Sequence, residues 1–169
     1  MCIRDREARI APIYEGTNGI QAADLVGRKL PMRGGAVVAE HLDSVDRLAG
    51  SLESQPDLAL FGANLRQAAA ATRRASEWLL EHGAADPNDA LAGSTPYMRM
   101  LGTVVCGGLM AKAVLAAREQ NEDPDGFYEA KIVSGKFFGE QILPTATALE
   151  GAATAGAGDL FALSPSQLG

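Results

Sequence analysis

The segment Leu58–His82 reads LALFGANLRQAAAATRRASEWLLEH and decides the fold class of this 169-residue chain. Along it, a set of mostly apolar residues recurs at alternating steps of four and three: Phe61, Leu65, Ala68, Thr72, Ala75 and Leu79. In an α-helix this spacing puts the set on one face, as a stripe that is buried against other helices. The segment therefore predicts a long amphipathic helix within a helical bundle.

The flanking sequence extends this pattern in both directions. A second stripe with the same steps predicts a helix over Ala36–Leu52; it consists of Val38, Leu42, Val45, Ala49 and Leu52. Another helix is predicted over Gly19–Leu30, before Pro31. The last helix is expected from Phe127 towards Ala153, with a kink or break at Pro144. The fold class we predict is all-α: about four main helices preceded by a short segment and helix.

The remaining helix, Pro96–Gln120, is apolar on most sides between Met100 and Leu115, so we expect it at the centre of the bundle. Its Gly102, Gly107 and Gly108 are predicted to allow close helix–helix approach, and its Cys106 to be a small core residue. Its most apolar stretch, Met100–Ala111, is 12 residues long, whereas a membrane span needs about 20.

Composition excludes several classes of protein. Hydrophobic residues make up 47% of the chain and aromatic residues only 5%, which favours closely packed helices over a β-sandwich. The net charge of −6 argues against nucleic-acid binding. Cys2 and Cys106 are too far apart for a CxxC site, and His41 and His82 have no companion ligands, so no metal site is predicted. We expect a cytoplasmic protein that does not bind membranes.

One turn stands out before the first predicted helix. Ile13–Gln21 reads IYEGTNGIQ and places Glu15 beside a glycine that lets another molecule approach the backbone. The helix after it offers free N–H groups and a positive dipole end, which suit a phosphate or an oxyanion. Glu15 is then a candidate general base. The alternative is a surface turn in which Thr17 or Asn18 caps the helix and Glu15 is solvated.

The longer stretch favours the first of these readings. Residues 8–21, ARIAPIYEGTNGIQ, and 24–30, DLVGRKL, closely resemble the catalytic-glutamate segment of acyl-CoA dehydrogenases. Within that family the chain looks like the branch that includes 3-methylmercaptopropionyl-CoA dehydrogenase and has an extra C-terminal helical domain. Residues 96–99 (PYMR) and 136–144 (KFFGEQILP) resemble that extra domain more diffusely.

The resemblance implies a role for each residue of the turn. Glu15 would be the base that removes the α-proton of an acyl-CoA thioester, and its backbone N–H would help to bind the thioester oxygen. Gly16 would lie against the acyl-CoA. Thr17, Asn18 and Gly19 match positions that contact FAD. An electron-acceptor protein and a homo-oligomer are further implied partners.

The resemblance also implies a division of the chain. Residues 1–33 would be the end of the catalytic domain and 34–169 the extra helical bundle, with residues 1–6 an artefactual start. Most of the family's flavin site is absent from these 169 residues. We therefore predict a C-terminal fragment that is inactive by itself and holds residues 1–33 only loosely. The competing hypothesis is a non-enzymatic helical module for interaction or oligomerisation.

Overall fold

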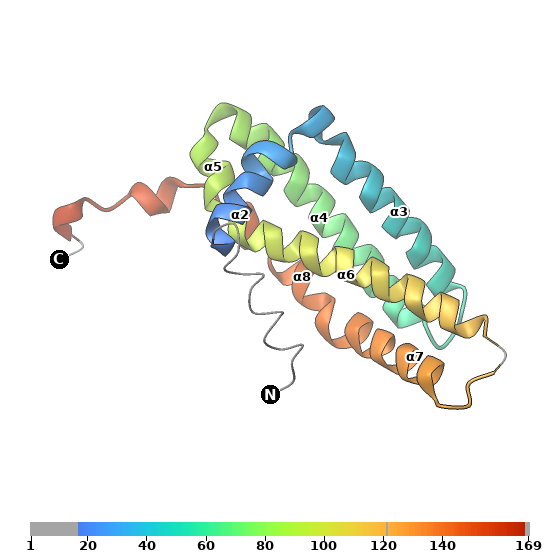
Figure 1. Cartoon of the computed structure of the whole chain (residues 1–169). Coiled ribbons are helices and arrows are strands. Elements are labelled where there is room, and N and C mark those ends of the chain that lie inside the picture. Colours follow the sequence, from blue (N-terminus) through green and yellow to red (C-terminus); the bar gives the residue numbers. More distant parts are fainter. Residues whose placement is uncertain (1–16, 121, 168–169) are drawn as a thin grey trace.

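The computed structural model describes residues 17–120 and 122–167, and every regular element in this part of the chain is helical, which confirms the predicted fold class. Figure 1 shows long helices packed side by side into a bundle, with shorter helices gathered at one end. In chain order the elements are α2 (Asn18–Asp24), the π-helical η1 (Leu25–Lys29), the 3₁₀ turn η2 (Met32–Gly35), α3 (Ala36–Glu53), α4 (Ala59–Ala85), α5 (Pro87–Ala92), α6 (Ser94–Arg118), α7 (Phe127–Phe137), the π-helical η3 (Phe138–Ile142), α8 (Pro144–Ala148), α9 (Glu150–Ala153) and the 3₁₀ turns η4 (Gly158–Phe161) and η5 (Pro165–Gln167).

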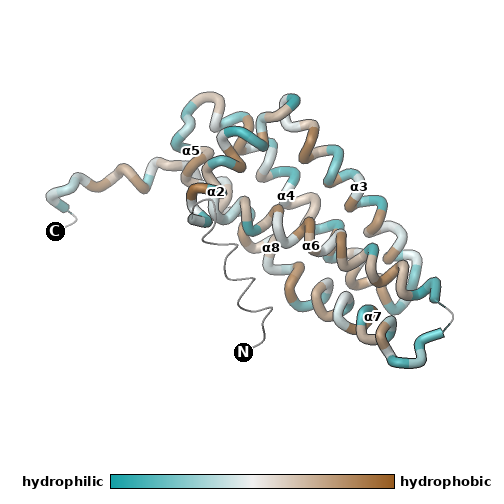
Figure 2. Tube along the Cα trace, in the orientation of Figure 1, coloured by the Kyte–Doolittle hydropathy of each residue, from teal (hydrophilic) through white to brown (hydrophobic). Residues whose placement is uncertain are grey.

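The two stripes read from the sequence face the interior. Every member of the α4 stripe is buried, and so is every member of the α3 stripe except the half-buried Val38. Figure 2 shows the corresponding alternation of hydrophobic and hydrophilic residues along α3. The contact between α3 and α4 is the most extensive in the bundle, and the α4 stripe is also covered by α6 and by the elements after it.

The buried residues form two cores. The first core lies among α3, α4, α6 and the α7–α8 segment; it consists of Leu42, Val45, Ala49, Leu52, Leu58, Phe61, Leu65, Ala68, Ala69, Val104, Ala111, Val114, Leu143 and Ala146. The second core lies where the short elements meet the ends of α4 and α6; it consists of Val26, Leu30, Ala71, Ala75, Leu79, Ala90, Tyr97, Met100 and Ala153.

Helix α6 is the central helix, as predicted, since it contacts α2, α3, α4, α7, α8 and α9. Two of its glycines permit close approach. A Cβ on Gly107 would lie 3.0 Å from the side chains of Leu65 and Leu143, and one on Gly108 would lie 3.3 Å from Val45. The prediction was wrong for Gly102 and for Cys106, which are both exposed. The apolar character of α6 therefore extends onto a face that the described part of the chain does not cover.

By length and composition alone, α6 is the one described helix that is able to cross a membrane. Its best 18-residue window has a mean hydropathy of 1.8, so the apolar region is longer than the stretch counted in the sequence. A central bundle helix meets the same criterion, and the neighbours of α6 bury 39% of that window. Packing within the bundle therefore accounts only for the buried part of this apolar window, and the absence of membrane binding stays a prediction.

The helix predicted from Phe127 is divided into several pieces. As expected, Pro144 ends the run, and it occupies the first turn of α8, where its missing N–H leaves no hydrogen bond unmade. A π-helical turn, η3, comes before it, and Leu143 N donates to Phe138 O over 2.9 Å. At η3 Gly139 lies directly against the Phe61 ring, and Asn64 Nδ2 donates to Gly139 O over 3.0 Å. Only a glycine fits this contact between η3 and α4.

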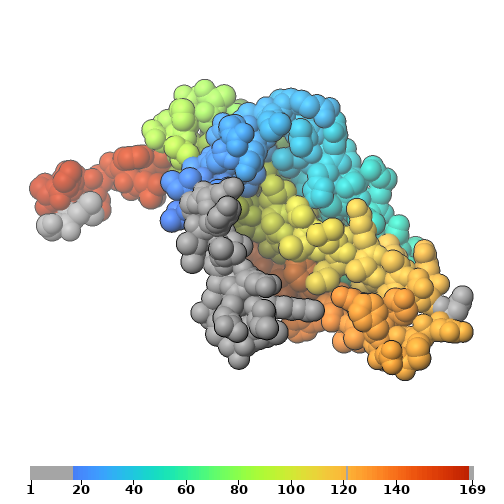
Figure 3. All heavy atoms as spheres, in the orientation of Figure 1, coloured from blue at the N-terminus to red at the C-terminus, as the bar shows by residue number. Residues whose placement is uncertain are grey.

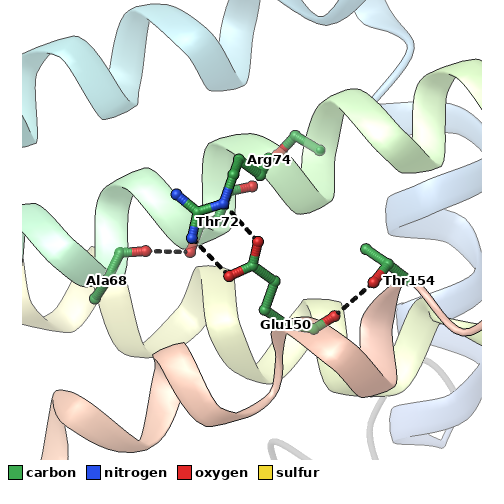
Figure 4. A network of polar contacts seen from close by, with 6 residues as sticks. Ala68, Thr72, Arg74, Glu150 and Thr154 are labelled. Atoms are coloured by element: carbon green, nitrogen blue, oxygen red, sulfur yellow. Dashed lines mark hydrogen bonds and ion pairs between the residues drawn. The ribbon is translucent and has the colours of Figure 1, made fainter.

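Helix α5 was not foreseen in the sequence. The cluster Asp86–Asn88 does end the long helix, but Asp86 also begins a new one, because its Oδ1 accepts a hydrogen bond from Asn88 N over 2.9 Å. Elsewhere on α4, Arg74 forms a two-point ion pair with Glu150 of α9, with N–O distances of 2.6 and 2.7 Å. Figure 4 shows this pair bridging the two helices.

Candidate functional site

The structure gives a position to part of the predicted site. Glu15 and Gly16 lie outside the described residues, so their assigned roles stay predictions. Thr17 is the residue before α2, and Asn18 and Gly19 form its first turn. All three are exposed, and they enter the bundle together at the end that holds the short helices.

The helix that carries these residues is anchored firmly. Ala22, Val26 and Leu30 are buried, and the last two belong to the second core with residues of α4, α5 and α6. Leu30 N donates to Leu25 O over 2.7 Å, which closes the π-helical turn of η1. The prediction that residues 1–33 are loosely held was therefore wrong for the described stretch 17–30.

The start of α2 is open on its outer side. Thr17 has the extended backbone of an N-cap residue, but its side chain makes no capping hydrogen bond. A Cβ built on Gly19 would meet nothing closer than Thr17 Oγ1, at 3.9 Å. Thr17 thus has the backbone position of the N-cap residue, as the surface-turn alternative predicted, but its side chain does not cap the helix. Its hydroxyl is exposed beside the open backbone of Gly19.

A charged cluster lies on the next turns of the same helix. Arg28 donates to both carboxylate oxygens of Asp24 over 2.7 and 2.9 Å, and Lys29 Nζ lies 3.0 Å from Asp24 Oδ2. Hydrogen bonds from Arg28 and Lys29 hold the pKa of Asp24 at about 2. Asp24 therefore stays ionised at neutral pH, and the three side chains together leave one positive charge on this surface.

Behind this helix runs an apolar groove of about 390 Å³ between η1, α4 and α5. Its walls are aliphatic or small side chains: Val26, Gly27, Pro31, Leu79, Leu80, Gly83, Ala84, Pro87, Ala90 and Leu91. It holds no acid, base or metal ligand. The groove suits an apolar occupant and has no chemistry of its own.

One buried polar pair supports this end of the bundle. Tyr97 is fully buried, and its hydroxyl lies 2.8 Å from Ser76 Oγ, which itself donates to Thr72 O over 2.7 Å. Burial raises the pKa of Tyr97 to about 12, so the hydroxyl stays protonated and donates to Ser76. Sequence reasoning missed this link between α4 and α6, since neither residue carries a sequence signal that pairs it with the other.

The described residues include no group of three or more His, Cys, Asp or Glu side chains that could hold a metal ion. His41 is exposed. His82 stacks on the Trp78 ring with centroids 4.0 Å apart, and its Nδ1 lies 2.9 Å from Trp78 O. Both histidines are thus placed as surface or packing residues.

The start of α2 fits a contact with a flavin dinucleotide on one side. Thr17 and Asn18 supply exposed polar groups, and Gly19 allows close approach of a ligand to the backbone. Between residues 17 and 120 and between 122 and 167, no second wall faces them. These residues would therefore form one edge of a cofactor site.

Comparison with known families gives this edge its context. A family model described as acetyl-CoA dehydrogenase C-terminal like matches residues 37–164, most of the chain. The chain belongs to this family. The match covers the bundle from α3 onward and confirms the resemblance to acyl-CoA dehydrogenases that was drawn from the turn before α2.

Individual relatives carry related names. The chain is 37% identical over 142 residues to a 3-methylmercaptopropionyl-CoA dehydrogenase of Ruegeria pomeroyi. It is 26% identical over 145 residues to a butyryl-CoA dehydrogenase of Syntrophomonas wolfei. It is 27% identical over 154 residues to a broad-specificity linear acyl-CoA dehydrogenase of Mycobacterium tuberculosis.

These alignments cover the two partners unequally. They include 82%, 82% and 84% of this chain but only 24%, 24% and 25% of the respective relatives. The chain thus spans about a quarter of the length of the curated relatives that it matches.

Proposed function

We propose that this chain is the C-terminal part of a flavin-dependent acyl-CoA dehydrogenase, which removes two hydrogens from the α and β carbons of an acyl-CoA thioester. The observation that carries the proposal is the continuity of the turn with the bundle. The sequence Glu15–Gly16 runs directly into the exposed Thr17, Asn18 and Gly19, and the buried Val26 and Leu30 fix this helix to a domain of the matched family.

Each residue of the turn has a distinct task in this proposal. Glu15 takes the proton from the carbon next to the thioester carbonyl, and its own N–H donates to the carbonyl oxygen as negative charge develops there. Gly16 lets the thioester approach the backbone because it has no Cβ. Bound FAD supplies the hydride acceptor for the β-hydrogen. Thr17, Asn18 and Gly19 hold part of that cofactor, with the hydroxyl and amide as polar contacts.

The proposal includes a division of labour along the chain. Residues 1–33 complete a catalytic domain, and residues 34–169 form an added helical bundle. Since the described residues supply only one edge of a cofactor site, the 169-residue chain alone is expected to retain no FAD and to show no activity. A cytoplasmic location, an electron-acceptor protein and a homo-oligomeric parent belong to the same proposal.

The finer substrate proposal is 3-methylmercaptopropionyl-CoA or a fatty acyl-CoA. The names and similarities of the three relatives support an acyl-CoA of short or linear chain. The groove behind η1 is lined by none of the residues proposed to contact the thioester, so it gives no basis for choosing among these substrates. Comparing kcat/KM for these thioesters in the parent enzyme tests this choice.

The deciding experiment uses the parent enzyme with Glu15→Gln. The substitution keeps the backbone N–H and the side-chain volume but removes the base, so flavin reduction is expected to slow by about 10²–10⁴-fold. The measurement is anaerobic bleaching of flavin absorbance after mixing with saturating acyl-CoA. Unchanged FAD content and acyl-CoA binding are the control for an intact site.

Two further variants separate the assigned roles. Thr17→Ala and Asn18→Ala are expected to weaken FAD retention more than they slow bleaching in molecules that hold FAD. Near-normal bleaching in Glu15→Gln would reject Glu15 as the base and favour the alternative that Glu15 is a solvated turn residue. A stoichiometric flavin spectrum with turnover in the 169-residue chain alone would reject the division into domains.

A further inference from the structure

Helix α6 carries an apolar stripe that faces outward. It consists of Gly102, Cys106, Leu109, Ala113 and Ala116, which recur at alternating steps of four and three and so share one side of the helix. Ala113 is half-buried and the other four are exposed, with Leu109 at 60%. A Cβ built on Gly102 would meet no heavy atom within 4 Å. We call this set the outer stripe, and the described part of the chain leaves it uncovered.

Solvated helix surfaces in the same bundle have a different composition. The exposed side of α4 carries mostly charged or polar residues: Arg66, Gln67, Arg74, Glu77 and Glu81. The outer stripe contains neither an acid nor a base, and α6 has none at all from Met100 to Ala111. Neighbouring residues bury only 39% of the most hydrophobic 18-residue window of α6. A continuous exposed apolar surface of this kind marks an interaction surface.

Helix α2 borders this surface. It packs on α6, and Figure 3 shows the blue α2 and the yellow α6 on one face of the molecule. Ala22 of α2 is fully buried, whereas Ile20, about 200° away around the helix, is 62% exposed and points away from the bundle. On α6, Leu101 packs against the second core, which includes Val26 and Leu30 of η1 and the residue after it. The outer stripe begins at the next residue, so it continues the contact between this segment and α6.

The proposed function places one particular domain over this face. Thr17, Asn18 and Gly19 are exposed and form a single edge of a cofactor site, so the rest of that site has to meet them from outside the bundle. From Leu101 to Leu109, α6 advances only about 12 Å. A domain of about 300 residues has a radius of gyration of about 19 Å. A domain that meets the start of α2 is therefore wide enough to reach the outer stripe as well.

We propose that the catalytic domain preceding Thr17 in the parent protein docks on the outer stripe of α6 in the same polypeptide. This docking extends the contact that α2 and η1 already make with α6. About three quarters of each curated relative lies outside the aligned region, which is enough for such a domain. The small residues of the stripe let an apolar helix or strand of that domain approach closely. The inference rests on the proposed function for the existence of the parent, but not on the role of Glu15.

The thiol of Cys106, within the outer stripe, reports directly on whether the stripe is covered. The parent and the 169-residue chain are treated with N-ethylmaleimide, and modification of the peptide that contains Cys106 is followed by mass spectrometry. We expect modification in the parent to be at least about 10-fold slower than in the 169-residue chain. Gln67→Cys on the exposed side of α4 is the control, with equal rates expected in both proteins.

Two results of this labelling would overturn the proposal. One is an equal rate for Cys106 in the parent and in the 169-residue chain. The other is slow labelling in the 169-residue chain that becomes faster on dilution, because a second copy would then be the molecule that covers the stripe.

Photo-cross-linking identifies what covers the stripe. A benzophenone amino acid replaces Leu109 in the parent, and in the control it replaces Leu60, which is 57% exposed on α4. Irradiation is expected to join position 109, but not position 60, to a peptide from the sequence before Thr17. Mixing isotope-labelled and unlabelled parent shows whether the two peptides come from one polypeptide. A cross-link only between copies, or none at position 109, would overturn the proposal.

These experiments separate the docked domain from the proposed catalysis. Normal flavin bleaching in Glu15→Gln together with slow labelling of Cys106 would reject Glu15 as the base and retain the docked domain. Bleaching that depends on Glu15 together with fast labelling of Cys106 would retain the base and reject the docked domain.

Discussion

The two cores of the bundle are built differently. The first is wholly apolar and is formed mainly by the long helices α3, α4 and α6, with the α7–α8 segment laid across them. The second gathers short elements around a buried tyrosine, and it includes Val26 and Leu30 from the helix that carries Thr17. We infer that the first core supplies most of the stability of the bundle, whereas the second fixes the position of the candidate site.

The largest expected effect comes from Leu65→Ala in the first core. Leu65 is fully buried and touches the position where α6 approaches at Gly107, so truncation leaves a cavity that cannot collapse. We expect a loss of about 2–5 kcal/mol in the free energy of unfolding, measured by urea denaturation. A loss below about 0.5 kcal/mol would mean that this face of α4 is not the packed one.

Leu30→Ala makes the matching change in the second core. Leu30 is also buried, but it anchors a short segment rather than two long helices. We expect a loss of about 2–3 kcal/mol that appears mainly as local opening. Hydrogen exchange should accelerate at amides 18–30 while those of α3 and α4 stay protected; equal acceleration everywhere would contradict the division into two cores.

Tyr97→Phe tests the polar link of the second core. At neutral pH it should cost about 0.5–1.5 kcal/mol, since one hydrogen bond to Ser76 is lost and the Ser76 hydroxyl keeps Thr72 O. In the native chain the pKa of Tyr97 is raised from 10.0 to about 12. The unfolded chain therefore releases this proton first as pH rises.

The consequence is a loss of stability between pH 10 and about 12. Tyr97→Phe should lack this part of the pH dependence. Urea denaturation of the native chain and of Tyr97→Phe across that pH range measures the difference in their free energies of unfolding. Groups that titrate in both proteins contribute equally and cancel in this difference. If the free energies of unfolding of the two proteins changed in parallel with pH, the Tyr97 hydroxyl would be exposed to water rather than buried.

The smallest effect is expected from Glu150→Gln, which weakens the ion pair between α4 and α9. Arg74 is largely exposed, so the change should cost only about 0.2–1 kcal/mol. Glu53→Gln is the control, because the Arg66–Glu53 pair joins α3 and α4 at the first core with similar exposure. Faster exchange at α9 amides in Glu150→Gln alone would show that the second core depends on this link.

The sequence anticipated the long elements better than the short ones. The α3 and α4 stripes were read correctly, because a regular spacing over many turns has one helical interpretation. Helix α5 and the π-helical turns were missed. Each depends on a contact with a distant residue, such as Asn64 with Gly139, or on a turn too short to have a period.

In the candidate site, too, the sequence predicted the local feature and missed the contacts with distant residues. The motif around Glu15 predicted which residues belong to the site, and the family match supports the family it resembles. It did not predict that Val26 and Leu30 enter the second core, since the tyrosine, alanines and methionine that receive them lie from about forty to more than 120 residues away in the chain.

The amino-acid sequence by itself determined the helical class, the two buried stripes, the break at Pro144 and the family, because each is written in local spacing or in a contiguous motif. Tertiary structure alone decided that Cys106 is exposed and that Gly139 meets Phe61. It also decided that Ala157, whose N–H donates to Asp89, and the groove at Leu91 lie on different sides of α5. A helix's period fixes which residues share a face, but only packing fixes which face is covered, since burial is a property of the neighbours as much as of the residue.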